Sequence, residues 1–439
     1  MEVQRKNIAV LGLGESGEAA AALLAKEGAN VTVLDTAEAR VLQPRIDRLR
    51  KLGISIIDGE AAERDEARYD LGILSPGIDP ATPLVQNFIR KRIDMIGELE
   101  LAWRFCACPV VAITGSNGKT TTTELTARVL NACGIKTLAA GNISPAFSAV
   151  VGQSRDLRLV TLEVSSFQLE TIRTFHPRVA ALLNLSPNHL DRYPSMTEYK
   201  AAKMRIFENQ TGDDFAIVTH RDGMPSLTAK TTTFSAYVPG GDFEMRDSII
   251  HFRGERVFDM AEARLKGQHN AENVMVAMAI GMIHGLGFAE MAEAIRTYHA
   301  PPHRCEIVRT LDGVEYVNDS KSTSLDAMEK ALKAEARPMV LIAGGKDKGF
   351  EFDPILDLVA GKCHDAVLIG EMAPRIAKSW EGRIPCHQAV SLAESVEIAR
   401  SLAKAGDVVM FSPGTSSYDM FRNFVERGNQ FRQLVQNLA

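Results

Sequence analysis

A glycine-rich turn followed by a lysine and two threonines is the feature of this 439-residue sequence that most directly indicates chemistry. A β-branched apolar run at residues 110–113 predicts a strand before the turn, and residues 121–132 predict a helix closed by Gly134. Backbone N–H groups of such a turn, with the N-terminus of the helix, form a concave anion site. The predicted phosphate-binding residues are Gly115, Ser116, Asn117, Gly118, Lys119, Thr120 and Thr121.

Two side chains of this turn would serve different parts of a magnesium nucleotide. Lys119 would lie near the outer phosphates, and the Thr120 hydroxyl would bind Mg²⁺. The spacing departs from the usual G-x-x-x-x-G-K-[ST] pattern, because the first glycine of that pattern would fall on Ile113 and stands at Gly115 instead. The alternative is a generic strand–helix turn with an exposed lysine, but motif and context together favour phosphate binding.

A second glycine motif, GLGESG at residues 12–17, lies between a predicted strand and a predicted helix. It matches G-x-G-x-x-G, and Asp35 ends the next strand, where dinucleotide-binding folds place a ribose-binding acid. Alone it would indicate an NAD-dependent oxidoreductase. It could also bind another diphosphate, such as that of a UDP-sugar, or be a tight turn without a ligand. An oxidoreductase needs no second, magnesium-type phosphate site, whereas a ligase that uses ATP and a nucleotide-linked substrate needs both.

Three downstream side chains could complete the magnesium-nucleotide site. Glu163 follows a predicted strand at residues 159–162, and ligands gather at the carboxyl ends of parallel strands. Its carboxylate suits Mg²⁺, although it could also be an acid at a helix N-terminus. His189 follows a predicted strand at residues 179–183, but a loop histidine is more often a surface residue. Lys203 lies on a predicted helix and would, taken alone, be a solvated lysine.

Short apolar runs alternate with helical patterns along the chain, which predicts α/β domains with largely parallel sheets. At about 150 residues per domain, the length predicts about three domains. We expect them at residues 1–97, 98–300 and 301–439, the last boundary marked by Pro301-Pro302. Further strands are expected at residues 8–11, 31–34, 71–74, 339–343, 366–369 and 408–412, helices at 18–26, 98–105 and 198–209, and hairpins at 238–241 and 253–254.

The bulk composition is that of an ordinary globular protein, with 45% hydrophobic and 24% charged residues. A net charge of −5 implies no broad basic surface, so nucleic acid and anionic membranes are not expected partners. No signal-peptide stretch and no run of 18 apolar residues occurs, so a cytoplasmic protein is expected. The cysteines show no zinc spacing and are expected to be thiols in a reducing compartment: Cys106, Cys108, Cys133, Cys305, Cys363 and Cys386.

Taken together, the motifs resemble the Mur ligase family over nearly the whole chain. SSFQLE and the C-terminal SSYDMF run favour its D-glutamate-adding members. The segments that carry the resemblance are GLGESG at 12–17, SPGI at 75–78, TGSNGKTT at 114–121, GNI at 141–143, LEVSSFQLE at 162–170, NHLDRYPSMTEYKAAK at 188–203, GQHNAEN at 267–273, HR at 303–304, NDSKSTS at 318–324, GGKDKG at 344–349 and SPGTSSYDMFRNFVERG at 412–428.

The resemblance implies a Rossmann-like N-terminal domain, a central phosphate-loop domain and a Rossmann-like C-terminal domain. It assigns the UDP-linked substrate to Gly14, Ser16, Gly17, Asp35, Thr36, Gly77 and Asn142. To the ATP site it adds Asn273, Arg304, Asp319 and Lys321. It assigns D-glutamate to Thr323, Lys348, Ser417 and Phe424.

The resemblance also implies two Mg²⁺ ions. Thr120 and Glu163 would hold one, and His189 and Lys203 the other, after CO₂ has converted the lysine to a carbamate. A neutral amine can trap CO₂, and the carbamate replaces a cation with an oxygen ligand. The implied catalytic set is Lys119, Glu163, His189 and Lys203. Asn188 and Lys346 differ from the family pattern, because acidic residues are expected there.

The implied reaction adds D-glutamate to UDP-N-acetylmuramoyl-L-alanine in the cytoplasmic stage of peptidoglycan synthesis. The L-alanine carboxylate attacks the γ-phosphorus of ATP, and the D-glutamate amine then attacks the acyl phosphate. His189 is a candidate base, a role that metal binding would exclude. The alternatives are another Mur-type or folylpolyglutamate-type ligase, an NAD-dependent oxidoreductase, and a nucleotide switch without turnover. We expect a monomer with no membrane insertion.

Overall fold

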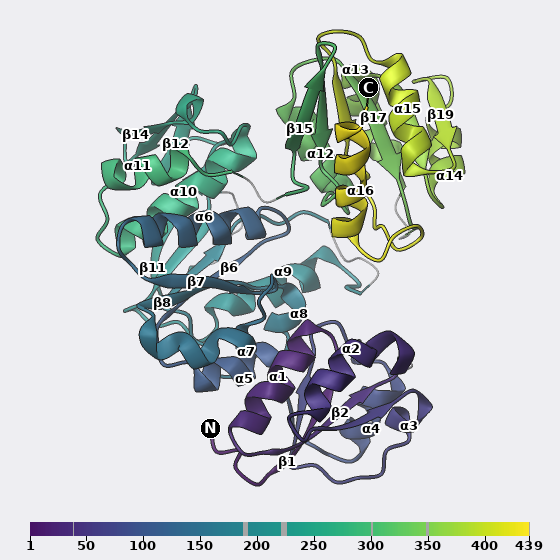
Figure 1. Cartoon of the computed structure of the whole chain (residues 1–439). Coiled ribbons are helices and arrows are strands. Elements are labelled where there is room, and N and C mark those ends of the chain that lie inside the picture. The colour runs from purple at the N-terminus through teal and green to yellow at the C-terminus, as the bar shows by residue number, and fades with distance from the viewer. Residues whose placement is uncertain (38, 188–191, 221–225, 300–301, 348–350, 439) are drawn as a thin grey trace. The chain divides into compact units, whose positions relative to one another are not determined.

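The computed structural model describes residues 1–37, 39–187, 192–220, 226–299, 302–347 and 351–438. The chain divides into two compact units (Figure 1). The first comprises Met1–Leu185, Thr197–Asp259 and Glu272–Arg296, and the second comprises Ser186–Met196, Met260–Ala271 and Thr297–Ala439. The first unit contains two sheets and the second contains one, and all three are mostly parallel.

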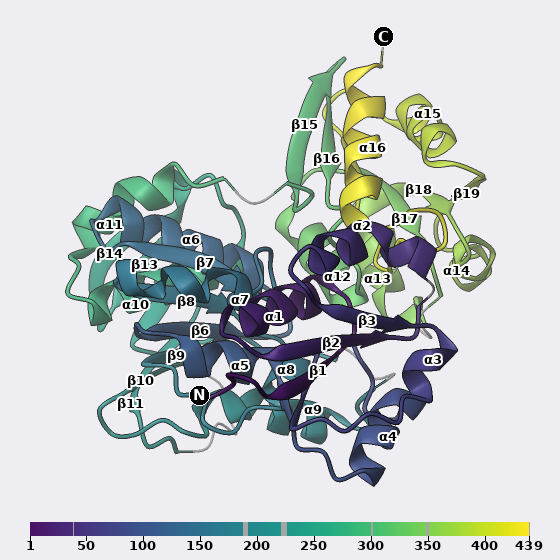
Figure 2. The same cartoon turned by 60° about the horizontal axis from the view of Figure 1, so that its bottom comes forward.

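The N-terminal sheet has the strand order β3-β2-β1-β4-β5, and all its pairs are parallel. Buried side chains place α1 and α2 on one face and α3 and α4 on the other (Figure 2). The order reverses between β1 and β4, so the loops after these strands lie where such sheets bind ligands. The elements are β1 (Asn7–Leu11), α1 (Glu15–Lys26), β2 (Asn30–Asp35), α2 (Ala39–Arg50), β3 (Ser55–Asp58), α3 (Glu60–Glu63), β4 (Leu71–Leu74), α4 (Pro83–Arg90) and β5 (Met95–Gly97).

The middle sheet has the strand order β14-β13-β12-β11-β10-β9-β6-β8-β7. Strands β6 to β12 run parallel to one another. At one edge, β13 pairs antiparallel with both β12 and β14. Helix α6 lies on one face, and α5 and α7 on the other (Figure 1). The strands are β6 (Val110–Thr114), β7 (Thr137–Gly141), β8 (Leu159–Glu163), β9 (Val179–Leu182), β10 (Phe215–Thr219), β11 (Lys230–Ser235), β12 (Phe243–Arg246), β13 (Ile249–Phe252) and β14 (Glu255–Asp259).

Helices of this region close the connections between the strands. They are α5 (Glu98–Phe105), α6 (Lys119–Ala132), α7 (Phe147–Val150), α8 (Ser166–Leu169), α9 (Met196–Met204), α10 (Gln268–Ile283) and α11 (Phe288–Arg296). The predicted helix at residues 198–209 is shorter in the structure, because α9 ends at Met204 and a 3-10 turn follows at Arg205–Phe207. The hairpin expected at residues 253–254 is confirmed by antiparallel β13 and β14. The hairpin expected at residues 238–241 is wrong, because β11 and β12 pair in parallel.

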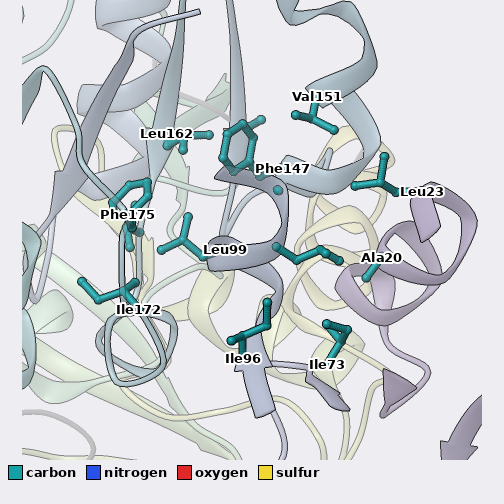
Figure 3. Close-up of a cluster of buried hydrophobic side chains, with 14 of the residues drawn as sticks. Ala20, Leu23, Ile73, Ile96, Leu99, Phe147, Val151, Leu162, Ile172 and Phe175 are labelled. Carbon is teal, nitrogen blue, oxygen red and sulfur yellow. The ribbon is translucent and has the colours of Figure 1, made fainter. Parts of the chain in front are cut away.

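One hydrophobic core joins the two sheets of the first unit. Helix α5 lies between them, and its Leu99 is fully buried. Figure 3 shows this cluster, in which Leu99 is surrounded by side chains from both sheets and their helices: Ala20, Leu23, Ile73, Ile96, Phe147, Val151, Leu162, Ile172 and Phe175. Buried Glu98 on α5 also accepts a hydrogen bond from the backbone N–H of Ser148 at 2.7 Å. The loops of the two sheets are therefore fixed within one packed body.

The sheet of the second unit has the order β15-β16-β20-β17-β18-β19, with only the edge strand β15 antiparallel. One face is covered by α12, α13 and α14, and the other by α15 and α16. The elements are β15 (Glu306–Leu311), β16 (Val314–Asn318), α12 (Leu325–Ala334), β17 (Met339–Gly344), α13 (Leu356–Lys362), β18 (Cys363–Ile369), α14 (Ala373–Ser379), β19 (Cys386–Ala389), α15 (Leu392–Leu402), β20 (Val408–Phe411) and α16 (Phe424–Gln436). None of the described helices is long and apolar enough to span a bilayer.

Candidate active site

The phosphate-type loop lies at the carboxyl end of β6, between β8 and β9 in the middle sheet. Helix α6 begins at Lys119, with Gly118 in the left-handed region at φ 82°. A side chain at Gly118 would also place a Cβ only 2.5 Å from Asn273 Oδ1. Glycine is therefore required there both by the backbone conformation and by the close neighbour.

The ammonium of Lys119 contacts the loop itself. Its Nζ donates to the carbonyl oxygens of Gly115 at 2.8 Å and Ser116 at 2.9 Å. The exposed-lysine alternative does not describe this residue, which is partly buried. A lysine in this position adds a positive charge to a turn that already presents N–H groups and a helix N-terminus to an anion.

A threonine and a glutamate meet beside the loop. Thr120 Oγ1 donates to Glu163 Oε2 at 2.7 Å, and both residues are buried. Glu163 is the last residue of β8 and not the start of a helix. Asn142 Nδ2 donates to the other carboxylate oxygen at 2.9 Å. The structure thus brings Asn142, which the family resemblance assigned to the UDP substrate, into hydrogen-bond contact with Glu163.

Lys203 is buried beneath the same loop, with 2% of its surface exposed. The solvated-lysine alternative is therefore wrong. Its Nζ donates to the Gly115 carbonyl at 2.9 Å and to Thr114 Oγ1 at 3.4 Å. Burial lowers the pKa of Lys203 well below its usual value, nearby Lys119 lowers the pKa further, and Glu163 partly opposes the shift. A larger fraction of this amine is neutral near pH 7 than for a surface lysine.

Two residues of the loop's surroundings were not predicted from the sequence. Asn184, two residues after β9, accepts from the Asn117 N–H at 2.9 Å and donates to its carbonyl at 3.1 Å. Tyr199 Oη lies 3.2 Å from Ser116 Oγ, and its ring lies under Lys203 Nζ. Tyr199 is four residues before Lys203, so the helical period places both on one face of α9. The sequence also carries a signal for Asn184, because polar residues just after a central strand often lie at the ligand-binding edge of a parallel sheet.

The N-terminal glycine loop connects β1 to α1, at the edge where β1 and β4 are neighbours in the sheet. Gly14 caps α1 and is exposed, with no atom near the position of a Cβ. Gly17 is required by packing, because a Cβ would lie 1.8 Å from the Gly12 carbonyl oxygen. Ser75 Oγ donates to that oxygen at 2.9 Å, so the two loops at the switch point support each other. Of the other predicted UDP-binding residues, Ser16 is half-buried, and Thr36 and Gly77 are exposed.

Asp35 uses both carboxylate oxygens within this loop. Oδ2 accepts from the Leu13 N–H at 2.6 Å and Oδ1 accepts from the Ala37 N–H at 2.8 Å. The carboxylate therefore fixes the glycine turn. This arrangement differs from the NAD-type alternative, in which the acid would offer its oxygens to a ribose.

The second unit carries the remaining predicted nucleotide residues. Arg304 lines a cavity of about 870 Å³, and its buried Nε has no hydrogen-bond partner among the described residues. Buried Asp319 accepts from Ser412 Oγ at 2.8 Å, and burial raises the pKa of Asp319 to about 6. Lys321 Nζ lies 5.7 Å from the centre of the Phe424 ring. A buried N–H donor in a cavity of this size fits an anionic ligand.

The predicted D-glutamate residues follow neighbouring strands of this sheet. Thr323 follows β16, and buried Ser417 follows β20. Phe424 is the first residue of α16. Lys348 and His189 lie outside the described residues.

Comparison with known proteins decides the family. A model of the Mur ligase MurD-like N-terminal domain matches residues 6–97, one of the Mur ligase middle domain matches residues 113–281, and one of the Mur ligase glutamate ligase domain matches residues 303–414. The UDP-N-acetylmuramoylalanine--D-glutamate ligase of Geobacter metallireducens is 40% identical, and the match covers 100% of this chain and 99% of that protein. The protein of the same name from Geotalea daltonii is 39% identical, with the same coverage. The chain belongs to the Mur ligase family.

Solved structures agree with this Mur ligase fold. The UDP-N-acetylmuramate-alanine ligase of Thermotoga maritima superimposes with a TM-score of 0.65 at 19% identity, covering 98% of this chain and 99% of that chain. The MurF ligase of the same organism, in complex with ADP, gives a TM-score of 0.61 at 16% identity, covering 100% and 97%. These identities support the fold only. The three-domain α/β architecture with mostly parallel sheets is thus confirmed.

This ATP-dependent Mur ligase presents oxygen ligands that fit Mg²⁺. Thr120 Oγ1 and Glu163 Oε2 are hard oxygen atoms beside a loop built for phosphate. Within the described ranges, no cluster of three or more His, Cys, Asp or Glu side chains could hold a metal ion. Mg²⁺ commonly binds through one or two carboxylates together with substrate phosphates and water, so this sparse donor set is suitable.

Proposed function

We propose that this protein joins D-glutamate to UDP-N-acetylmuramoyl-L-alanine with the hydrolysis of ATP to ADP and phosphate. The observation that carries the proposal is the pairing of Thr120 with Glu163 beside the loop that begins at Gly115, in a chain whose relatives bear that enzymatic name. An oxidoreductase has no use for this arrangement. The enzyme is therefore an acid–D-amino-acid ligase of peptidoglycan synthesis.

We assign one substrate to each proposed domain. Residues 1–97 would bind the UDP moiety, through the N-terminus of α1 at Gly14, Ser16 and Gly17. Residues 98–300 would bind ATP, and residues 301–439 would bind D-glutamate. The shared core around Leu99 supports this assignment, because it holds the proposed UDP loop and the proposed ATP loop within one packed unit.

In the first step the L-alanine carboxylate attacks the γ-phosphorus of ATP. The loop N–H groups and Lys119 would orient the phosphates and balance the charge that moves to the leaving ADP. Thr120 and Glu163 would hold a Mg²⁺ ion, which neutralises phosphate charge when bound. Asn142 would keep the Glu163 carboxylate oriented through its hydrogen bond.

We propose that Lys203 is carbamylated by CO₂ and helps His189 to hold a second Mg²⁺ ion. The burial of Lys203 and its lowered pKa support this, because only the neutral amine attacks CO₂. Carbamylation would also remove a second positive charge from beside Lys119. The oxygen atoms so created suit a hard cation.

In the second step the neutral amine of D-glutamate attacks the acyl phosphate, and phosphate leaves. Lys348, Thr323, Ser417 and Phe424 would bind D-glutamate, and cationic groups there would offset the loss of water from its carboxylates. Arg304, Asp319, Lys321 and Asn273 would contact ATP. We expect the reaction to take place in the cytoplasm, where ATP is supplied, and the enzyme to act as a monomer.

The proposal is tested by phosphate release from ATP with purified protein, Mg²⁺ and UDP-N-acetylmuramoyl-L-alanine. A panel of amino acids is added one at a time: D-glutamate, L-glutamate, L-lysine, meso-diaminopimelate and L-alanine. We expect release with D-glutamate only. Phosphate release with another amino acid would indicate a sister ligase. No phosphate release with any amino acid would exclude the ligase altogether.

A further inference from the structure

Arg427 is a fully buried cation that the reaction scheme above does not use. It lies on α16, and none of its surface is exposed. Burial lowers the pKa of Arg427 to about 10, so it remains charged at neutral pH. A buried guanidinium is costly unless its donors are satisfied. The hydrogen bonds of Arg427 therefore indicate which parts of the fold this side chain stabilises.

The guanidinium donates hydrogen bonds to two loops, and the charges of Asp419 and Asp319 partly offset the lowering of its pKa by burial. Its Nη2 donates to the Ser320 carbonyl at 2.8 Å, and its Nε to Ser320 Oγ at 3.0 Å. Its Nη1 and Nη2 donate to the Thr415 carbonyl at 3.2 and 3.3 Å. Ser320 follows β16 and Thr415 follows β20, two strands that pair in parallel. Arg427 thus joins the loops at the carboxyl ends of adjacent strands.

The same loops carry the proposed D-glutamate residues. Thr323 is three residues after Ser320, and Ser417 is two residues after Thr415, while Lys321, which is proposed for ATP, directly follows Ser320. Ser320 Oγ in turn donates to the Phe424 carbonyl at 2.8 Å. The bonds of one guanidinium therefore hold the backbone three residues before Thr323 and two residues before Ser417, and Ser320 extends the network to the Phe424 carbonyl.

A third loop packs onto this arrangement. Gly345, which follows β17, lies so close that a Cβ there would be 2.4 Å from the Ser416 carbonyl oxygen and 3.3 Å from Arg427 Nη1. Lys346 N–H donates to the same Ser416 carbonyl at 2.9 Å. The loop after β17 thus packs against the loop after β20 and lies close to Arg427.

We infer that Arg427 is a positioning residue for the D-glutamate site, which sets the spacing of the loops that bind the amino acid and adds a buried positive charge beneath them. The inference rests on the proposed function. Only arginine combines a rigid fork with five donors, which is what two loop carbonyls and a hydroxyl require. A lysine keeps the charge but cannot bridge the loops in the same way.

The test uses R427K and R427Q in the full-length enzyme, with kcat and KM measured separately for D-glutamate, ATP and the UDP substrate. Because both variants lose the fork that holds the two loops at a fixed spacing, we expect KM for D-glutamate to rise by at least about tenfold in each. KM for the UDP substrate should stay within about twofold of wild type, and KM for ATP, whose proposed residues Asp319 and Lys321 flank Ser320, should rise less than KM for D-glutamate. R432K is the matched control, since Arg432 on the same helix pairs with Glu306 at 2.8 Å.

An unchanged KM for D-glutamate in R427K would overturn the inference, as would an equal rise in all three KM values, which indicates a general structural role. If R427Q does not fold, R427K and S320A decide together, because S320A removes the hydroxyl that accepts from Arg427 and donates to the Phe424 carbonyl. S320A must then also raise KM for D-glutamate selectively. Wild-type enzyme that ignores D-glutamate would refute the proposed function instead, and the variants would then be compared with the amino acid it accepts.

Discussion

At the scale of single residues, the site is organised by two lysines that contact one carbonyl. Lys119 on α6 and Lys203 on α9 both donate to the Gly115 oxygen. Two ammonium groups so close repel each other, and the repulsion adds to burial in lowering the pKa of Lys203. The loop therefore combines one lysine suited to bind phosphate with one suited to react as a neutral amine.

Replacing Lys119 or Glu163 by alanine should abolish phosphate release. Each change removes a charged group that we propose acts on the nucleotide phosphates, and losing one such electrostatic contact typically costs about 10²–10³ in kcat. The measurement is phosphate release with all substrates present. K51A, at an exposed lysine of the N-terminal domain, should behave as wild type. Turnover close to wild type in K119A or E163A would contradict the proposed mechanism.

The proposed carbamylation of Lys203 predicts that activity lost on mutation can be restored chemically. K203A should be nearly inactive and should regain activity with formate or acetate, because these supply the missing carboxylate oxygen ligands. K203R should be inactive and should not respond, because arginine stays protonated. In ¹³CO₂-saturated buffer, a carbamate signal should be present in the wild-type ¹³C spectrum and absent from K203A. Normal activity in K203A would rule out the role.

Asp214 gives a pH-dependent prediction at a site remote from the chemistry. Burial alone would raise the pKa of this carboxyl, but hydrogen bonds from His176 at 2.6 Å and from Thr211 lower it to about 2. The folded pKa lies below the unfolded value, so this group stabilises the protein above about pH 4, by about 2 kcal/mol, and loses that effect as the pH falls toward about 2.

D214N should accordingly lower the apparent melting temperature at pH 7 and pH 5, and the difference from wild type should shrink below pH 4. D213N, at the exposed neighbouring residue, is the control and should leave the melting temperature unchanged. A D214N difference that is constant from pH 7 to pH 3 would show that the carboxylate charge is not the cause.

At this scale the sequence predicted the residue types of the site better than their contacts. The loop, Glu163 and Lys203 could be found because glycines, strand ends and motifs are local signals. Arg427 could not, since its partner Ser320 lies 107 residues away along the chain. The position of Asn184 after β9 was a local signal, but its contact with Asn117, 67 residues away, was not. The two hydrogen bonds that occupy Asp35 were equally hidden, because the sequence shows an acid at a strand end and not which groups it accepts from.

At the scale of elements, helix α5 connects the two nucleotide-type sheets. Leu99 on α5 is fully buried in a core that contains side chains of both (Figure 3). Removing its branched side chain leaves a cavity, so L99A should destabilise the first unit by about 2–5 kcal/mol. Trp103, on the same helix, reports the transition by fluorescence in a W380F background that removes the other tryptophan.

L52A provides the surface control, because Leu52 is 55% exposed and its truncation should cost less than about 0.5 kcal/mol. A Trp103 transition that is unchanged in L99A would show that α5 does not join the two sheets into one cooperative body.

The strands and helices were predicted to within a few residues where the hydrophobic period was regular, as at β4, β17 and α5. The errors arose where turn residues carried the prediction. Glycine and proline at residues 238–241 indicate a change of direction, but they do not distinguish a hairpin from a short connection between parallel strands. The helix predicted at residues 198–209 was too long, because the local pattern continues through the 3-10 turn that follows α9.

At the scale of the whole molecule, the chain forms three mostly parallel sheets, and we propose that each binds one of the three substrates at its strand ends. The sequence predicted this α/β organisation because apolar strands alternate with helices throughout. It could not predict that the N-terminal and middle sheets share one core, since that depends on contacts between helices far apart in the sequence. The ligase mechanism depends on the transfer of the γ-phosphoryl group to the substrate carboxylate before the amine attacks.

That transfer is tested most directly by the fate of a carboxylate oxygen. UDP-N-acetylmuramoyl-L-alanine labelled with ¹⁸O in the L-alanine carboxylate is incubated with enzyme, ATP, Mg²⁺ and D-glutamate, and the released phosphate is examined by mass spectrometry. An acyl phosphate intermediate requires that the phosphate carry ¹⁸O from the substrate. Phosphate without the label, accompanied by normal formation of the D-glutamyl product, would contradict the account.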